Sequence, residues 1–222
     1  MVSTGVRLFA LLAALSLGVA ACGQAPGSNA RTATPLSSTS LNPARIDRVR
    51  TELPSGYEVA GLSGRAAPAA FWGLRSDWAA DPPRCGALAD PAADAATTRG
   101  WSASGAGGIV YAVAAVSKAT LDPSLIDECG RWSVSAGHTR ARVSIVAAPT
   151  IDGAVTVGAS AATTTVVEGG IETHSHADTF TAYLGDYVAF VTVVTDPGSP
   201  NPPLGQDFAA NLLVKTVSAL RG

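Results

Sequence analysis

Two histidines and an aspartate toward the C-terminal end of the chain have the types and spacing of metal ligands. His174, His176 and Asp178 lie at positions i, i+2 and i+4, so on a β-strand all three side chains project from one face. Two neutral imidazoles and a carboxylate could coordinate Zn²⁺, with His138 or Glu172 completing the shell. The alternative is that these residues form the solvent-facing side of an antiparallel sheet, where histidines titrate near neutral pH without binding metal.

A serine in a glycine-rich stretch comes close to the pattern of a hydrolase nucleophile. Residues 100–108 read GWSASGAGG, in which Ser102 has the place of the nucleophile in G-x-S-x-G but Ser104 replaces the last glycine. The glycines that follow lead into an expected strand, whereas a dinucleotide-binding loop opens a helix. We therefore interpret the stretch as a glycine-rich turn. A hydrolase that pairs Ser102 with His138 or His174 is the alternative.

The first cysteine, Cys22, lies where a lipid anchor is expected. It follows Arg7 and the apolar residues 8–19, which are too few to span a bilayer, since that takes about 20 residues, but suit a signal-peptide core. Residues 19–22 read VAAC and resemble the bacterial lipobox, whose cysteine is acylated, for example with palmitate, and becomes the first residue of the mature chain. We expect residues 1–21 to be a lipoprotein signal peptide and Cys22 to carry the membrane anchor. The alternative is an ordinary signal peptide in which Cys22 is incidental.

The segment after Cys22 has the composition of a tether. Residues 23–40 read GQAPGSNARTATPLSSTS, without apolar periodicity. Such a segment cannot bury enough apolar surface to offset the entropy lost on ordering. We therefore expect residues 22–40 to be a lipidated, disordered linker. It would hold a single folded domain, residues 41–222, at the extracytoplasmic face of the cell membrane, and that domain is long enough for its own hydrophobic core.

The other two cysteines, Cys85 and Cys129, predict a structural disulfide. An exported protein with two remaining cysteines most often pairs them. A metal site would need matching histidine spacing nearby, and a redox pair would need C-x-x-C, and the sequence has neither.

The chain has few aromatic residues, so the position of each is informative. Six of them could line an apolar cleft that suits a lipid or another envelope metabolite. These six are Trp72, Trp78, Trp101, Trp132, Phe71 and Tyr57. The alternative is that they fill the core, because a chain rich in alanine, glycine and valine needs large side chains to occupy its interior.

The charge balance excludes some classes of partner. Removing Arg7 from the 15 basic residues leaves 14 against 17 acidic residues, a formal charge of −3. No basic cluster occurs, so we expect neither nucleic-acid binding nor polybasic docking on a membrane. No second apolar run approaches the length of a membrane span.

The remaining patterns predict helices at both ends of the folded region and strands between them. Asn42 and Pro43 open a short helix, residues 122–129 form another, and the apolar residues from Phe208 to Leu220 recur at helical spacing. Residues 61–100 are expected to be irregular or weakly helical. Strands are expected over 57–59, 109–116, 131–135, 141–147, 155–167, 171–183 and 187–194. The fold class is therefore α+β, a mostly antiparallel, twisted sheet with an N-terminal and a C-terminal helix packed on it.

These features together resemble a known group of proteins. The resemblance rests on the lipobox, the tether and three segments, LPSGYEVA (53–60), PPRCGALADP (82–91) and LDPSLIDECGRWSVSAGHT (121–139). They are similar to a family of mycobacterial lipoproteins of unknown function, and through it to the extracellular sensor domain of the mycobacterial kinase PknH. The resemblance implies a mixed helix-and-sheet domain with a ligand cleft, and it supplies no ligand residues.

We therefore expect a non-enzymatic ligand-binding or sensor-like module of the cell envelope, without a cofactor. Its partners would be the membrane, through the lipid anchor, and an envelope small molecule, a lipid or a protein. An envelope hydrolase or metal-dependent enzyme built on the face of His174 and His176 is the main alternative. A purely structural envelope protein is the other, and would differ from the binding module only in lacking a cavity.

Overall fold

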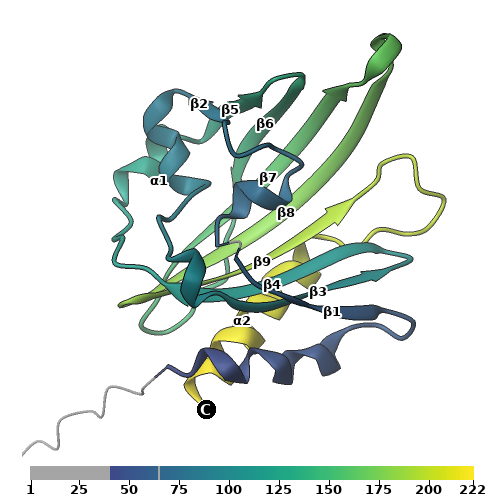
Figure 1. Cartoon of the computed structure of the whole chain (residues 1–222). Helices are drawn as coiled ribbons and strands as arrows, with labels where there is room; N and C mark the ends of the chain where they lie inside the picture. The colour runs from purple at the N-terminus through teal and green to yellow at the C-terminus, as the bar shows by residue number, and fades with distance from the viewer. Residues whose placement is uncertain (1–40, 65) are drawn as a thin grey trace, which may run out of the picture. The chain divides into compact units, whose positions relative to one another are not determined.

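Nine antiparallel strands form one sheet in the computed structural model, which describes residues 41–64 and 66–222 (Figure 1). The strands are β1 (Glu58–Leu62), β2 (Ala79–Asp81), β3 (Arg99–Gly105), β4 (Gly108–Val116), β5 (Arg131–Ala136), β6 (Thr139–Val146), β7 (Val155–Val166), β8 (Glu172–Leu184) and β9 (Tyr187–Thr195). Their lateral order is β1-β3-β4-β9-β8-β7-β6-β5-β2. The α+β class with a mostly antiparallel sheet is confirmed.

The strands from β5 to β9 form the expected meander, in which each strand pairs with the next one along the chain. Tight turns make this order possible, as at Gly185, whose φ of +63° suits glycine in the turn between β8 and β9. The hairpin of β7 and β8 is the longest and extends past its neighbours (Figure 1). The other half of the sheet, β1, β3 and β4, joins the meander where β4 pairs with β9.

Short helices connect and cover the strands. The α-helices are α1 (Ser124–Glu128) and α2 (Gln206–Arg221), and the 3₁₀ helices are η1 (Pro43–Glu52), η2 (Pro68–Phe71), η3 (Pro83–Leu88), η4 (Ala95–Thr97) and η5 (Glu168–Gly170). The N-terminal helix begins as predicted, because Asn42 Oδ1 accepts a hydrogen bond from the amide of Ala44 at 3.0 Å. It differs from the expectation in being a 3₁₀ helix, whose terminal amides bond to carbonyls three residues back.

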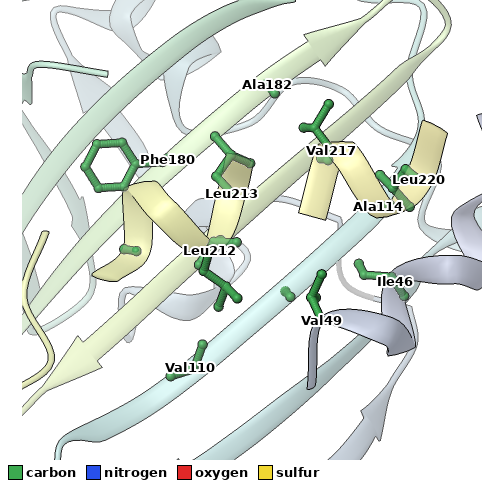
Figure 2. Packing of buried hydrophobic residues seen from close by; sticks show 14 of the residues in the cluster. Ile46, Val49, Val110, Ala114, Phe180, Ala182, Leu212, Leu213, Val217 and Leu220 are labelled. Carbon is green, nitrogen blue, oxygen red and sulfur yellow. The ribbon is translucent and has the colours of Figure 1, made fainter. Parts of the chain in front are cut away.

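One core lies between the sheet and the pair formed by α2 and η1. Leu212, Leu213, Val217 and Leu220 of α2 pack over β4, β8 and β9, as Figure 2 shows. Beside them η1 contributes Ile46 and Val49. The two helices also meet at their polar edges, where Lys215 pairs with Glu52. The predicted apolar stripe of the C-terminal helix is therefore buried against the sheet.

A second core lies on the opposite face, over β5, β6 and β7. Its cover is made of η2, η3 and α1, and the disulfide between Cys85 and Cys129 joins the last two. Both cysteines are buried, with 1% and 0% of their surface exposed. Arg84 forms an ion pair with Glu128 beside the disulfide. The predicted pairing of the two cysteines is present in the structure.

Residues 61–100, which the sequence predicted to be irregular or weakly helical, are partly helical as expected and also contain strand. They include three 3₁₀ helices and the edge strand β2, and the last of them begin β3. The stretch that we interpreted as a glycine-rich turn is mostly β3, and only residues 105–108 make the turn into β4. That prediction was wrong because β3 gains its hydrogen bonds from β1 and β4, so its pairing outweighs the low strand propensity of its glycines and serines.

Several expectations fall outside the described residues. The signal peptide, Cys22 and the tether up to residue 40 are among them. No helix among residues 41–64 and 66–222 is long and apolar enough to cross a membrane.

Candidate functional site

Within residues 41–64 and 66–222, no helix lies over one half of one face of the sheet. On the side of the sheet where α2 packs, the helix covers β8 and β9, and η1 covers β3 and β4. The same side of β5, β6 and β7 carries polar residues, because alternate residues of these strands point into the second core. We call this exposed area, together with the adjoining end of β8, the polar face.

The register places the residues of the polar face in three rows, since directly paired residues project to the same side. From β5 to β8 the rows are Ser135, Arg140, Thr164 and His174; Ser133, Arg142, Ala162 and His176; and Arg131, Ser144, Ser160 and Asp178. The three residues His174, His176 and Asp178 therefore share a face, as their spacing predicted. The structure adds arginines and hydroxyls that the sequence analysis did not include.

A groove runs along β7 within the polar face. Its floor is made of short side chains, Ala162 and Thr164, whereas the neighbouring positions carry Arg140 and Arg142 on β6 and His174 on β8. The walls belong to strands that are two spacings apart, about 10 Å. The groove has a volume of about 630 Å³. This is the size range of small-molecule sites in proteins.

The arginines of the polar face have no acidic partners. All 17 acidic residues of the chain lie among the described residues, and none of them forms an ion pair with Arg131, Arg140 or Arg142. The one acidic side chain in the groove lining, Glu172, lies on β8 and is 3.9 Å from His174 Nε2. The β6 side of the groove therefore has unbalanced positive charge.

Asp178 on β8 lies at the edge of the polar face, next to the first residue of α2. This carboxylate is buried, with 7% of its side chain exposed. Gln206, the first residue of α2, donates from Nε2 to Asp178 Oδ1 at 3.2 Å. His176 Nε2 lies 3.1 Å from the same oxygen and 3.2 Å from Ser160 Oγ. Asp178 thus joins the sheet to α2 through a polar network, and a buried charge with such partners is tolerated.

The network changes the protonation of both ionisable members. The hydrogen bond to Asp178 raises the pKa of His176 above its ordinary value of 6.5, against the opposing effect of burial. Burial acts to raise the pKa of Asp178, but its hydrogen bonds with His176, Ser160 and Gln206 and the charge of His176 together lower it below the usual 3.8. The charged pair is thus favoured in the folded protein.

We expect the network to make stability depend on pH. A raised folded pKa means that His176 contributes fully below about pH 6.5 and loses its contribution as the pH rises through the folded pKa. Asp178 contributes above about pH 3.8 and loses its contribution as the pH falls through its lowered pKa. Because 37% of the His176 side chain is exposed, solvent screening limits the alkaline loss to on the order of 0.5 kcal/mol.

Urea denaturation between pH 5.5 and pH 8.5 measures this loss. The variant His176→Gln should show a smaller fall in the free energy of unfolding over that range than the parent chain. His174→Gln is the matched control on the same strand face, and it should keep the fall of the parent. Equal pH profiles for the parent and His176→Gln would contradict the role of the pair.

The residues Ser160, His176 and Asp178 do not form a catalytic triad. In a triad the carboxylate contacts one ring nitrogen of the histidine and the nucleophile contacts the other. Here both Ser160 Oγ and Asp178 Oδ1 lie against Nε2. One nitrogen carries at most one proton, so it cannot donate to the carboxylate and accept the serine proton at once.

The hydrolase alternative built on Ser102 also lacks its geometry. Ser102 lies on β3, between Trp101 and Ala103, which point toward α2, so its own side chain is on the other face. His174 is on the α2 side of β8, three strands away, and His138 is in the turn between β5 and β6. The structure therefore does not bring Ser102 together with either histidine.

The zinc alternative is not supported by the arrangement of the side chains. Among the described residues there is no group of three or more His, Cys, Asp or Glu residues that could hold a metal ion. His176 is paired with Asp178, and His174 is hydrogen-bonded to Thr164, at 3.2 Å between Nδ1 and Oγ1. The polar face of an antiparallel sheet, which the sequence left as the alternative, describes these residues better.

The tryptophans do not line a common cleft. Trp101 is in the core under η1 and donates from Nε1 to the carbonyl of Ile46 at 3.1 Å. Trp72 and Trp132 are in the core on the opposite face, with ring centroids 6.2 Å apart, and Trp78 packs at the edge of that core. Their placement matches the alternative of core filling.

A second groove lies elsewhere and offers less chemistry. It has a volume of about 450 Å³ and lies between the β3–β4 turn and the loop that precedes α2. Its one charged lining residue among the described parts of the chain is Asp196, whose Oδ1 accepts from the amide of Gly198 at 2.8 Å. The groove of the polar face is therefore the candidate site.

The residues that the sequence analysis missed are Arg140 and Arg142. Their signal was the strand pattern of residues 139–146, TRARVSIV, in which polar residues alternate with apolar ones. This alternation places Arg140 and Arg142 on one face of the strand, but it does not indicate which residues of the neighbouring strands share that face.

Comparison with known proteins places this fold. A family model described as a domain of unknown function (DUF5642) matches residues 42–221. The X-ray structure of an uncharacterised protein from Mycobacterium smegmatis, the Rv0999 ortholog, is similar with a TM-score of 0.62 and 20% identity, over 84% of this chain and 100% of that chain. The crystal structure of the extracellular domain of PknH from Mycobacterium tuberculosis is similar with a TM-score of 0.44 and 13% identity, over 89% and 98%. No curated protein matches. The resemblance to a family of unknown function, which the sequence motifs indicated, is thus confirmed by the family model.

Proposed function

The chain belongs to the DUF5642 family, and from its polar face we propose that it acts as a non-enzymatic, sensor-like module that binds a ligand of the cell envelope. The observation that carries the proposal is the groove along β7, where unpaired arginines face histidines across a floor of short side chains. On the same face, helices bury apolar residues of β3, β4, β8 and β9, and on the opposite face they bury apolar residues of β5, β6 and β7. Convergent polar groups in a concave site are what fixes the orientation of a ligand and makes its binding specific.

The proposed location is the extracytoplasmic face of the membrane, with a lipid anchor on Cys22. The disulfide supports an oxidising compartment, because such bonds persist in exported proteins and are rare in the cytosol. The VAAC sequence at residues 19–22 supports acylation at Cys22. Residues 22–40 would then be the tether between the anchor and the domain.

Mass spectrometry of the full chain, expressed in a mycobacterial host and extracted in mild detergent, tests both parts of the proposal. The denatured mass should correspond to a chain that begins at Cys22 and carries acyl groups. The native mass should exceed it by the mass of a bound ligand, which is lost on denaturation. A chain cleaved elsewhere without acyl groups would contradict the anchor, and equal native and denatured masses would contradict a retained ligand.

A further inference from the structure

We propose that the groove of the polar face binds a small ligand with two anionic groups, phosphate or carboxylate, held by Arg140 and Arg142. The inference rests on the proposed function and specifies the ligand class of the same site. It is carried by the unpaired arginines, by the shape of the groove and by the position of its single acidic residue.

The two arginines are spaced for two anionic groups. They occupy consecutive outward positions on β6, about 7 Å apart along the strand. A guanidinium presents a planar fork of donors that pairs with both oxygens of a carboxylate or with two oxygens of a phosphate. No acidic residue of the chain forms an ion pair with either arginine, so both forks are open to a ligand.

The floor leaves room for the ligand beside the arginines. Ala162 is the β7 neighbour of Arg142, and Thr164 is the β7 neighbour of Arg140. Both are short, so a group bound to a guanidinium can lie over β7 instead of in bulk water. Ser135, the β5 neighbour of Arg140, adds a hydroxyl to the lining on the other side. The hydroxyl of Ser135 can donate to an anionic oxygen that the arginines leave unsatisfied.

The charge of the groove favours an anion on its β6 side. Glu172 is the single acidic residue in the lining, and it lies across β7 from the arginines and next to His174. The chain as a whole has a formal charge of −2, so the positive charge here is local. An anion at Arg140 and Arg142 would be placed away from Glu172 and would neutralise this local charge.

A small solute fits the groove better than a nucleic acid. Among the described residues the lining contains no tryptophan, tyrosine or phenylalanine on which a base could stack, and three exposed arginines are few for tracking a phosphate backbone. The volume of about 630 Å³ is that of a small-molecule site.

Calorimetric titration of the full chain with tripolyphosphate tests the inference. Tripolyphosphate supplies adjacent anionic groups, and we expect saturable binding that weakens as salt is added. Arg140→Gln and Arg142→Gln should each weaken binding about tenfold, the effect of losing one charge-assisted hydrogen-bonding partner. Arg48→Gln is the matched control, since Arg48 is also exposed and unpaired among the described residues but lies on η1. It should bind as the parent does.

A second arm separates two sources of the same chemistry. Vesicles that contain phosphatidylglycerol present the phosphate as a lipid headgroup, and binding that the two groove variants lose would assign the anion to a lipid. Binding of tripolyphosphate alone would assign it to a free solute. Unchanged unfolding curves for the variants would show that they remain folded.

The inference is overturned if the parent binds neither probe, or if Arg48→Gln weakens binding as much as the groove variants do. This outcome is distinct from failure of the proposed function. A neutral ligand retained in the native mass spectrum, together with no binding of either probe, would keep the binding module and remove the anionic ligand. An empty native spectrum with groove-dependent binding of tripolyphosphate would keep the anion site and show that its ligand exchanges freely.

Discussion

Replacing Cys85 and Cys129 together by alanine lowers the free energy of unfolding by about 4 kcal/mol. The disulfide joins residues 44 positions apart, and releasing a loop of that length restores conformational freedom mainly to the unfolded chain. The bridge also joins η3 to α1 inside the core that covers β5, β6 and β7. Its loss therefore affects the core on the opposite side of the strands that carry the polar face.

Urea denaturation of the parent and the double variant measures this effect. Parent protein that is reduced while unfolded and refolded with its thiols kept reduced is the control, and it should lose a similar amount of stability. A loss below about 1 kcal/mol in both samples would contradict the expected contribution. A loss in the alanine variant alone would instead assign the effect to the packing of the two sulfur atoms, since both cysteines are buried.

The meander could be predicted from the sequence because local patterns determine it. Alternation of side chains gave the strands from β5 to β9 to within about two residues, and glycine turns gave their antiparallel order. β3 could not be predicted in this way. Its residues, RGWSASG, have low strand propensity, and its structure depends on pairing with β1, some 40 residues earlier in the chain.

The candidate site could be predicted only in part. The spacing of His174, His176 and Asp178 was enough to place them on one strand face. Their meeting with Arg140 and Arg142 depends on the register of β6 with β7 and of β7 with β8, which no local pattern specifies. The exposure of the groove depends further on where α2 ends its cover of the sheet, at Gln206 beside Asp178.

The tryptophans illustrate the same limit. The sequence indicated that large side chains were needed somewhere, and it allowed either a cleft or a core. The choice depends on which face each residue takes. Trp101 points toward α2 and η1, and Trp72 belongs to the core on the opposite face. Residues on opposite faces of one sheet cannot line one cleft.

Replacing Trp101 by alanine should cost about 4 kcal/mol of unfolding free energy. The side chain is fully buried, with 0% of its surface exposed, in the core that η1 and α2 share with the sheet. Its removal leaves a cavity under η1 and also removes the hydrogen bond from Nε1 to the carbonyl of Ile46. Since this bond links η1 to β3, we expect η1 to pack less tightly against the sheet and to open more readily.

Two further variants separate the effect of the cavity on stability from the effect of the lost hydrogen bond. Trp101→Phe keeps most of the volume but leaves the carbonyl of Ile46 without its donor, so its loss should be smaller, about 1–3 kcal/mol. Trp78→Ala is the control at another tryptophan, one that is only partly buried, and it should lose less than Trp101→Ala. Urea denaturation ranks the three, and hydrogen exchange reports whether amides of η1 open first in Trp101→Ala. If Trp78→Ala lowered the free energy of unfolding more than Trp101→Ala, the expectation that the fully buried tryptophan contributes more to stability would be contradicted.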